Sequence, residues 1–288
     1  MSFEILPPTD DWIFKLLFGD ERNKSILIAL LKSFLELPQE EYEMTFLDTS
    51  LKPETVEDKL GIVDVKVKTK SGKIIDIEIQ VHPMKHIGKR LSFYKSKLIV
   101  EQIGKSELYN VIQRVICICI TSYELFPKEK EYVNKFRFYN PKNGLLFEEI
   151  PEEVYTMELP KVPLEDDGRA VWEWLQFLRS KRKEEFEMIG ERNVEIKKAV
   201  ETLYELSGDE EVRAEYERRQ KAWRDQLSQN EGYYQDGIQK GRIEGRIEGR
   251  VEGRVETLIE TARKLKEMGL SMEQIIAVTG LSSEALIK

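Results

Sequence analysis

The sequence has few of the residues that cross-link a protein or anchor it in a membrane. It contains two cysteines in 288 residues, and its longest apolar stretches fall far short of the roughly eighteen residues of a transmembrane helix. Cys117 and Cys119 lie two positions apart in an apolar run, so on a strand they would share a face where a mutual disulfide is implausible. The first residues also lack the basic and apolar regions of a secretory signal. We therefore expect a soluble protein of the reducing cytoplasm.

Basic residues are also fewer than acidic residues over the whole chain. Lys and Arg number 45 against 53 Asp and Glu, and the net charge of -8 repels a polyanion. Any contact with nucleic acid must therefore come from a local patch. Between residues 84 and 105 there are six basic residues and one acid, a patch that could hold phosphates or simply be a solvated helix face. The candidate nucleic-acid contacts are Lys66, Lys89, Arg90, Tyr94 and Lys97.

The spacing of apolar residues divides the chain into three segments. Residues 1–163 combine helical spacing, over 11–37 and 85–105, with the short or alternating runs that are typical of strands. This mixture predicts an α/β domain. Residues 164–230 have a helical composition, and residues 231–288 contain a glycine repeat followed by a pair of short helices.

Residues 61–82 predict a β-hairpin with acids on one face. Apolar and polar residues alternate on both sides of a three-residue loop that ends at Gly72, and this loop sets Asp64 across from Glu78. Their Cβ atoms would be about 5 Å apart. Two carboxylates at that distance repel each other unless a cation neutralises them, and Mg²⁺ prefers such oxygen ligands. The alternative is a solvated sheet face on which neighbouring lysines screen the acids.

Several short motifs, in one order and spacing, carry a resemblance to a known family. They are Asp11–Gly19 (DWIFKLLFG), Ile62-Val63-Asp64, Ile77-Glu78-Ile79-Gln80, and Arg90 with Tyr94. From about residue 11 to 163 the chain resembles the Rpn family, the recombination-promoting nucleases and transposases of the PD-(D/E)XK superfamily, and the glycine-rich tail is similar too. The resemblance implies a restriction-endonuclease-like fold, a mixed sheet flanked by helices, followed here by an extended α-helical C-terminal region.

The resemblance also implies a metal-dependent DNA endonuclease with Mg²⁺ or Mn²⁺ as its cofactor. Asp64 and Glu78 would bind the ion, and with Gln80 they would form the catalytic set. The backbone carbonyl of Ile79 is a candidate third ligand. Asp11 is another candidate, although an acid near a helix N-terminus also has a purely structural use.

Gln80 departs from the superfamily pattern, which has lysine at this position. A glutamine amide can orient an attacking water but supplies no positive charge to a developing phosphorane. A substitute cation would come from Lys66, Arg90 or Lys97, and the sequence does not choose among them. The departure leaves open a catalytically silent DNA-binding or assembly protein that keeps the nuclease fold. A helical oligomer whose N-terminal domain binds another protein is a third hypothesis.

The tail repeats a four-residue unit over residues 237–256 (GIQK-GRIE-GRIE-GRVE-GRVE). Its five glycines would cost a lone helix about 5 kcal/mol relative to alanine, and like charges recur four residues apart. We expect the glycine stripe to pack closely against other helices and to make the protein a homo-oligomer. A linker with little order is the alternative.

Overall fold

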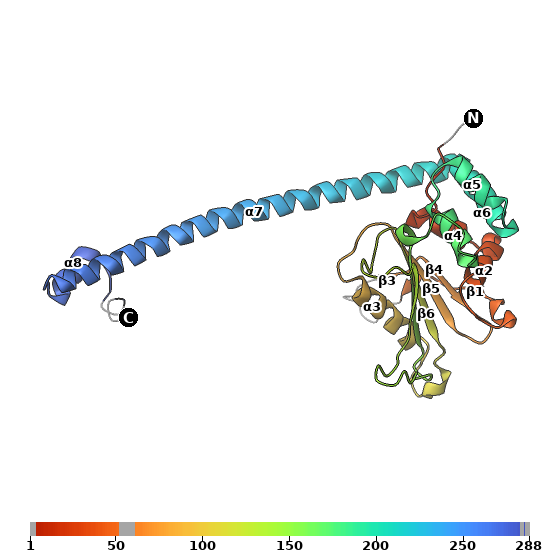
Figure 1. Cartoon of the computed structure of the whole chain (residues 1–288), viewed down its shortest axis with the longest axis horizontal. Coiled ribbons are helices and arrows are strands. Elements are labelled where there is room, and N and C mark those ends of the chain that lie inside the picture. The colour runs from red at the N-terminus through yellow and green to blue at the C-terminus, as the bar shows by residue number, and fades with distance from the viewer. Residues whose placement is uncertain (1–3, 52–60, 283–284, 286–288) are drawn as a thin grey trace. The chain divides into compact units, whose positions relative to one another are not determined.

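The computed structural model describes residues 4–51, 61–282 and 285 (Figure 1). Two compact units, Met1–Tyr216 and Glu217–Lys288, are considered separately. The helices of the first unit are α1 (Asp11–Phe18), α2 (Lys24–Lys32), α3 (Ile87–Val100), α4 (Ala170–Arg179), α5 (Lys183–Gly190), α6 (Val194–Gly208) and the start of α7 (Glu210–Glu267). The strands are β1 (Thr45–Phe46), β2 (Ser50–Leu51), β3 (Gly61–Ile62), β4 (Val65–Lys68), β5 (Ile74–Gln80), β6 (Val115–Thr121), β7 (Val133–Phe136) and β8 (Glu152–Glu158).

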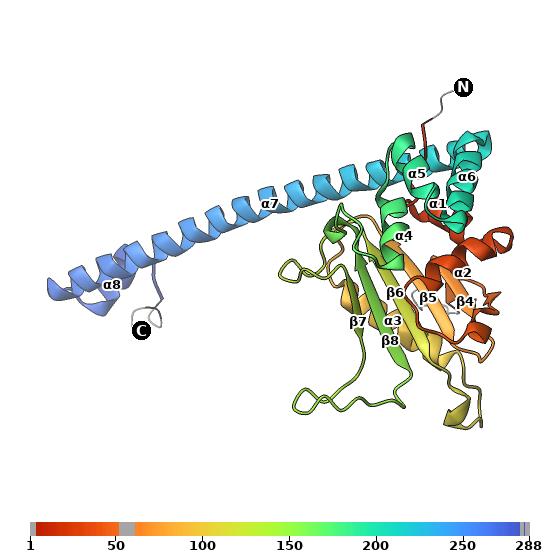
Figure 2. The ribbon, with the colours of Figure 1, turned by 45° about the vertical axis from the view of Figure 1, so that its right-hand side comes forward.

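A mixed six-stranded sheet forms the centre of the first unit, in the order β1-β4-β5-β6-β8-β7. β5, β6 and β8 are parallel, whereas β1, β4 and β7 pair antiparallel with their neighbours. β2 and β3 form a separate antiparallel pair. Figure 2 shows α3 against one face of the sheet and α1, α2 and α4 on the side of the other face. The predicted α/β fold, a mixed sheet flanked by helices, is confirmed.

Alternation along the central strands makes the two faces of the sheet different. Ile75, Ile77 and Ile79 of β5 are buried in the main core, together with side chains of the helices on that side. The intervening residues of β5 face α3, where Cys117 and Cys119 of β6 also lie in small clusters beneath the helix. Both cysteines are free thiols on one face, as expected. The side that α3 covers therefore combines a few apolar residues with the acids of β5.

The β4–β5 hairpin has the register that the sequence predicts. Val65 pairs with Ile77 and Lys66 pairs with Asp76. In the connecting loop Gly72 has a φ of 94°, and its N–H donates to the Thr69 carbonyl over 3.0 Å. A positive φ strains a residue that has a Cβ but not glycine. Gly72 thereby sets the loop length, which in turn decides which residues share a face.

Helices α4, α5 and α6 belong to the same core as the sheet. Trp174 of α4 and Phe186 of α5 are fully buried in it, and the Trp174 ring lies 6.2 Å from that of Phe18 in α1. The first compact unit accordingly continues to Tyr216. The segment limits expected at residues 163 and 230 remain an interpretation of composition.

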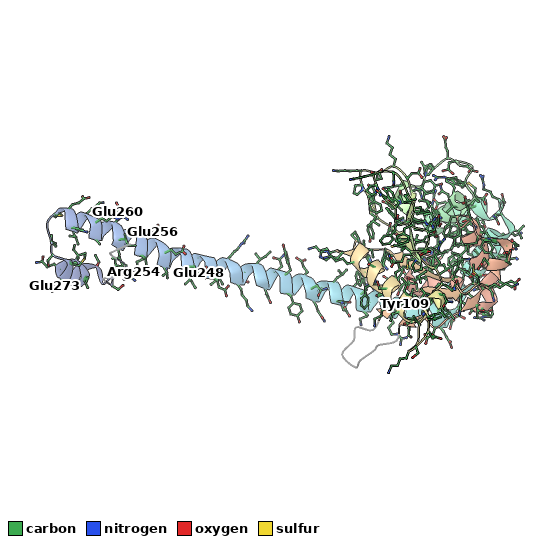
Figure 3. The ribbon with its side chains drawn as sticks, turned by 90° about the horizontal axis from the view of Figure 1, so that it is seen from below. Tyr109, Glu248, Arg254, Glu256, Glu260 and Glu273 are labelled. Atoms are coloured by element: carbon green, nitrogen blue, oxygen red, sulfur yellow. The ribbon has the colours of Figure 1, made fainter. Side chains whose placement is uncertain are left out.

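The second unit consists of the rest of α7 and of α8 (Met272–Thr279). The glycine repeat is α-helical throughout, and Figure 3 shows Glu248 and Arg254 projecting outward from this helix. Ala262 and Ile275 are buried at the end of the unit, where α8 lies along α7 (Figures 1 and 3). The last of the short helices expected there falls mostly outside the described residues. Within the described parts of the chain, no helix is long and apolar enough to cross a bilayer.

Substitution of Gly72 tests whether this residue maintains the hairpin. Gly72→Ala should lower the free energy of unfolding by about 1–2 kcal/mol, because alanine is strained at positive φ and its Cβ would lie 3.1 Å from Cγ of Gln113. Urea unfolding measures the change. Gly88→Ala is the control, since a Cβ at that position in α3 meets open space, and its stability should be unchanged or slightly higher. Equal effects of the two substitutions would contradict the role of Gly72.

Candidate functional site

Two predicted site residues, Asp64 and Glu78, lie together beneath α3. Asp64 immediately precedes β4, and its Oδ2 accepts a hydrogen bond of 2.9 Å from the N–H of Ile79 in β5. The β4–β5 register, continued by one residue, sets Asp64 across from Glu78. Glu78 is 1% exposed. The hairpin thus brings the two carboxylates to one buried face.

A third acid, Asp76, shares this face and is fully buried. Neither of its oxygens has a hydrogen-bond partner of ordinary geometry within the described residues, and the neighbouring thiol of Cys117 in β6 is a weak donor. Sequence reasoning did not place Asp76 in the site. The alternation of β5 could have identified it, because Asp76 and Glu78 are two residues apart and must point the same way.

Burial raises the pKa values of all three acids, and repulsion by neighbouring carboxylates adds to the effect. Burial raises the pKa of Glu78 to about 9, and the charges of Asp64 and Asp76 add to the effect. Burial also raises the pKa of Asp76 to about 7, with a further contribution from Asp64. The pKa of Asp64 is raised too, chiefly by burial, while the Ile79 N–H and the Lys15 charge act against it. Each carboxylate therefore keeps its charge only at a cost unless a cation is nearby.

Two helices bring cations to these carboxylates. Lys15 of α1 places its Nζ 3.5 Å from Oδ1 of Asp64. Arg90 of α3 places its Nη2 3.5 Å from Oε2 of Glu78, and its guanidinium stacks on the ring of Tyr94 at 4.9 Å. Sequence reasoning named Arg90 and Tyr94 but missed Lys15. The available signal was its position in the DWIFKLLFG motif, one helical turn after Asp11.

Gln80 also lies in the site, and the three lysines predicted to contact nucleic acid, Lys66, Lys89 and Lys97, lie outside it. Nε2 of Gln80 donates a hydrogen bond to Oε2 of Glu78 over 3.2 Å. Lys66 is buried and pairs with Glu101 at 3.1 Å, so it does not lie on the surface with the other candidates. Lys89 is exposed on α3, and Lys97 is half-buried on the same helix beside the ring of Phe93.

Asp11 lies in the first turn of α1, close enough for its charge to raise the pKa of Asp64. Its structural alternative was to stabilise the helix N-terminus. The preceding residue, Asp10, caps this end, because its side chain accepts hydrogen bonds from the N–H groups of Trp12 and Ile13. The ligand role of Asp11 remains a prediction.

The donor set fits a hard divalent cation that retains water ligands. Within the described residues, no three Asp, Glu, His or Cys side chains converge into a complete metal centre. Oε1 of Glu78 is buried without a hydrogen-bond partner among these residues, and Asp64 lies beside it. In a strand, the N–H and C=O of one residue point to the same neighbour, so the Ile79 carbonyl lies on the side of Asp64. Two carboxylates, a carbonyl and waters are an ordinary set for Mg²⁺.

A comparison with protein families shows which family this chain is related to. A family model described as PD-(D/E)XK nuclease family transposase matches residues 8–232, well over half of the chain. The chain belongs to this family. Searches of curated proteins and of solved structures returned no match.

Membership of the PD-(D/E)XK nuclease family transposases confirms the resemblance drawn from the short motifs. The match extends beyond those motifs through α4, α5 and α6 into α7, in agreement with the shared core. The family supports a nuclease-like or transposase-related function, and its nucleases generally use divalent metal ions. The roles of Asp64, Glu78 and Gln80 in this member remain predictions.

The raised pKa of Glu78 predicts a stability that falls as pH rises. Its pKa is about 9 in the folded protein and near 4.5 when the chain is unfolded, so between about pH 5 and 9 the folded state retains a proton that the unfolded chain has lost. The free energy of unfolding of metal-free protein should therefore decrease across this window. Glu78→Gln removes this contribution, and its stability should decrease less.

Urea unfolding at pH 5, 7 and 9 in the presence of a chelator measures this difference. Glu43→Gln is the matched control, since Glu43 is an exposed carboxylate that pairs with Lys70 at the surface. An identical pH dependence for wild type and Glu78→Gln would contradict the shift.

Proposed function

We propose that this protein is a metal-dependent DNA endonuclease that hydrolyses phosphodiester bonds. The observation that carries the proposal is the pair Asp64 and Glu78, held on one buried face with a carboxylate oxygen that has no partner in the described chain. Two acids with raised pKa values in one place are costly for a fold, and such costs are typical of functional sites. The family match supports nuclease chemistry, and it implies DNA as the substrate.

Asp64, Glu78 and the Ile79 carbonyl would hold the ion, with Asp11 as a further candidate. When bound, Mg²⁺ or Mn²⁺ would lower the pKa of a coordinated water and offset the charge that develops on the phosphate. The amide of Gln80 is within hydrogen-bond distance of Glu78, so it can orient a water at the same oxygen. Arg90, fixed by stacking on Tyr94, is placed to bind a phosphate next to the acids.

The outer surface of α3 is the proposed DNA contact. Lys89, Phe93 and Lys97 follow one another at four-residue spacing and so share one face of the helix, where Lys89 and Phe93 are exposed. Lysines there would neutralise phosphates, and an exposed aromatic ring can stack on an unpaired base. The ion pair between buried Lys66 and Glu101, the residue that follows α3, would support α3 against the sheet without touching DNA.

A catalytically silent DNA-binding protein is the alternative function, and Gln80 is the observation that favours it. A neutral amide at the lysine position removes one source of transition-state stabilisation. The two functions differ in cleavage and agree in DNA binding, so the same experiment distinguishes them.

Loss of either carboxylate should slow cleavage strongly. Wild type is expected to nick supercoiled plasmid in Mg²⁺ or Mn²⁺, whereas Asp64→Asn and Glu78→Gln should be slower by roughly 100-fold or more because a charged ligand is lost. Both variants should keep their DNA affinity in a salt titration with Ca²⁺. Glu43→Gln, which changes an exposed carboxylate outside the site, is the control. DNA binding by a wild type that does not cleave would select the silent alternative.

We further propose that α7 joins copies of the chain. A Cβ added at any of the five repeat glycines would meet open space, so no close contact among the residues that the structure describes explains glycine there. Five glycines in one helix cost about 5 kcal/mol, and their regular spacing is understandable if another helix approaches closely. Ile243, Ile247, Val251 and Val255 are 40–58% exposed and offer apolar surface for burial in such an assembly.

The charges of the repeat favour parallel association. At about 100° per residue, Gly, Arg, Ile or Val and Glu follow one another around the helix, so each apolar stripe has Arg on one flank and Glu on the other. In a parallel pair with a two-fold axis along the helices, the Arg flank of one copy meets the Glu flank of the other. An antiparallel pair would place like charges together. The N-terminal units of both copies would then be attached at the same end of the paired helices.

Leucine at three repeat glycines distinguishes close packing from a flexible linker. Replacement of Gly241, Gly245 and Gly249 by Leu should reduce the molecular mass measured by light scattering, because the backbones can no longer approach, even though intrinsic helix propensity improves. Circular dichroism checks that helix content is kept. Wild type is expected to be at least a dimer, and an unchanged mass in the triple variant would contradict the packing role of the glycines.

A further inference from the structure

Lys15 brings positive charge to Asp64 and Glu78 from α1, a helix outside the β4–β5 hairpin that carries these acids. Its Nζ lies 3.5 Å from Oδ1 of Asp64. The other oxygen of this carboxylate is held by the N–H of Ile79, so the ammonium stands at the oxygen that remains for a metal ion. The Lys15 charge also lowers the pKa of Glu78 against the effect of burial. Lys15 therefore acts on both proposed ligands.

The three cations that the sequence offered as substitutes have other contacts. Lys66 is buried with its Nζ 3.1 Å from Oε2 of Glu101. Lys97 lies 5.5 Å from the centroid of the Phe93 ring, on the outer part of α3. Arg90 does reach Glu78, but its guanidinium is also stacked on Tyr94, which restricts its movement during a reaction.

Helix α1 is a firm support for Lys15. Ile13, Phe14, Leu17 and Phe18 are fully buried in the main core, and the side chain of Asp10 caps the first turn. Lys15 is on the same short helix, and its side chain is 26% exposed at the edge of the acid site. The helix backbone is held in place by the core, whereas the flexible Lys15 side chain can contact a substrate that arrives from solvent.

We infer that Lys15 supplies the positive charge that Gln80 lacks and stabilises the charge developing on the scissile phosphate. This role rests on the proposed nuclease function. Because like charges repel, the Lys15 ammonium would move away from Oδ1 of Asp64 if this carboxylate held a metal ion. Its four-carbon stem then allows the ammonium to contact a phosphate oxygen next to Asp64. Lys15 thus neutralises Asp64 in the metal-free protein and the phosphate during the reaction.

If Lys15 competes with the ion, its removal should change metal affinity and cleavage rate in opposite directions. Lys15→Met in the full-length protein should bind Mn²⁺ several-fold more tightly than wild type by calorimetric titration, because a competing charge is gone. Its single-turnover cleavage at saturating Mn²⁺ should nevertheless be slower by roughly 100-fold, since a donor to the developing charge is lost. Lys15→Arg, which retains the charge, should recover a substantial part of the rate. A residue with only a structural role would lose metal affinity and cleavage together.

Two further variants complete the experiment. Lys24→Met is the matched control, because Lys24 pairs with Glu21 at the surface of neighbouring α2, and it should match wild type in both measurements. Cleavage that persists in Lys15→Met but is lost in Arg90→Met would overturn the inference and assign the role to Arg90, while the nuclease function stands. Weaker Mn²⁺ binding by Lys15→Met would also overturn it. A wild type that binds Mn²⁺ but does not cleave DNA would reject the proposed function itself.

Discussion

Burial of carboxylates on one face of β5 is the constraint on which the rest of the nuclease-like unit depends. The strand must pack Ile75, Ile77 and Ile79 into the main core, and strict alternation then forces Asp76 and Glu78 to the side of α3. Charged groups removed from water need cations or hydrogen-bond donors nearby. Helices α1 and α3 supply the cations, and the backbone of β5 supplies a hydrogen-bond donor.

Those contacts come from separate parts of the chain, which makes the site sensitive to the whole fold. Lys15 belongs to α1 on the main-core side, whereas Arg90 belongs to α3 on the other. The N–H of Ile79, which would pair with β4 if that strand continued, donates to the side chain of Asp64 instead. The end of a strand thereby becomes a binding position for a carboxylate, and in the proposed function the same backbone segment would offer a carbonyl to a metal ion.

The charge of the chain is divided between two kinds of surface. The net charge of -8 opposes general attraction to DNA, so the proposed DNA contact would depend on the short basic face of α3 and on the residues that flank the acids. In α7 the charges are balanced, and Arg and Glu lie on opposite flanks of the apolar stripe. This arrangement offers little to a polyanion and would match the proposed association with a second copy of the same helix. The proposed partners, DNA for α3 and a second copy of the chain for α7, thus differ because the two helices carry different spatial patterns of charge.

The sequence by itself determined the elements and the faces of the acid hairpin. Alternation and the three-residue loop at Gly72 predicted the β4–β5 register, because a shift by one residue would exchange the buried and polar faces. Only the tertiary structure decided which cations meet the acids. Lys15 and Asp64 are 49 positions apart, and no local periodicity relates a helix to a strand at that distance. Likewise, the sequence placed Lys66 among the surface contacts, but packing of α3 buries it against Glu101. Pairing of this kind depends on how elements dock, a property of three-dimensional packing that spacing along the chain does not encode.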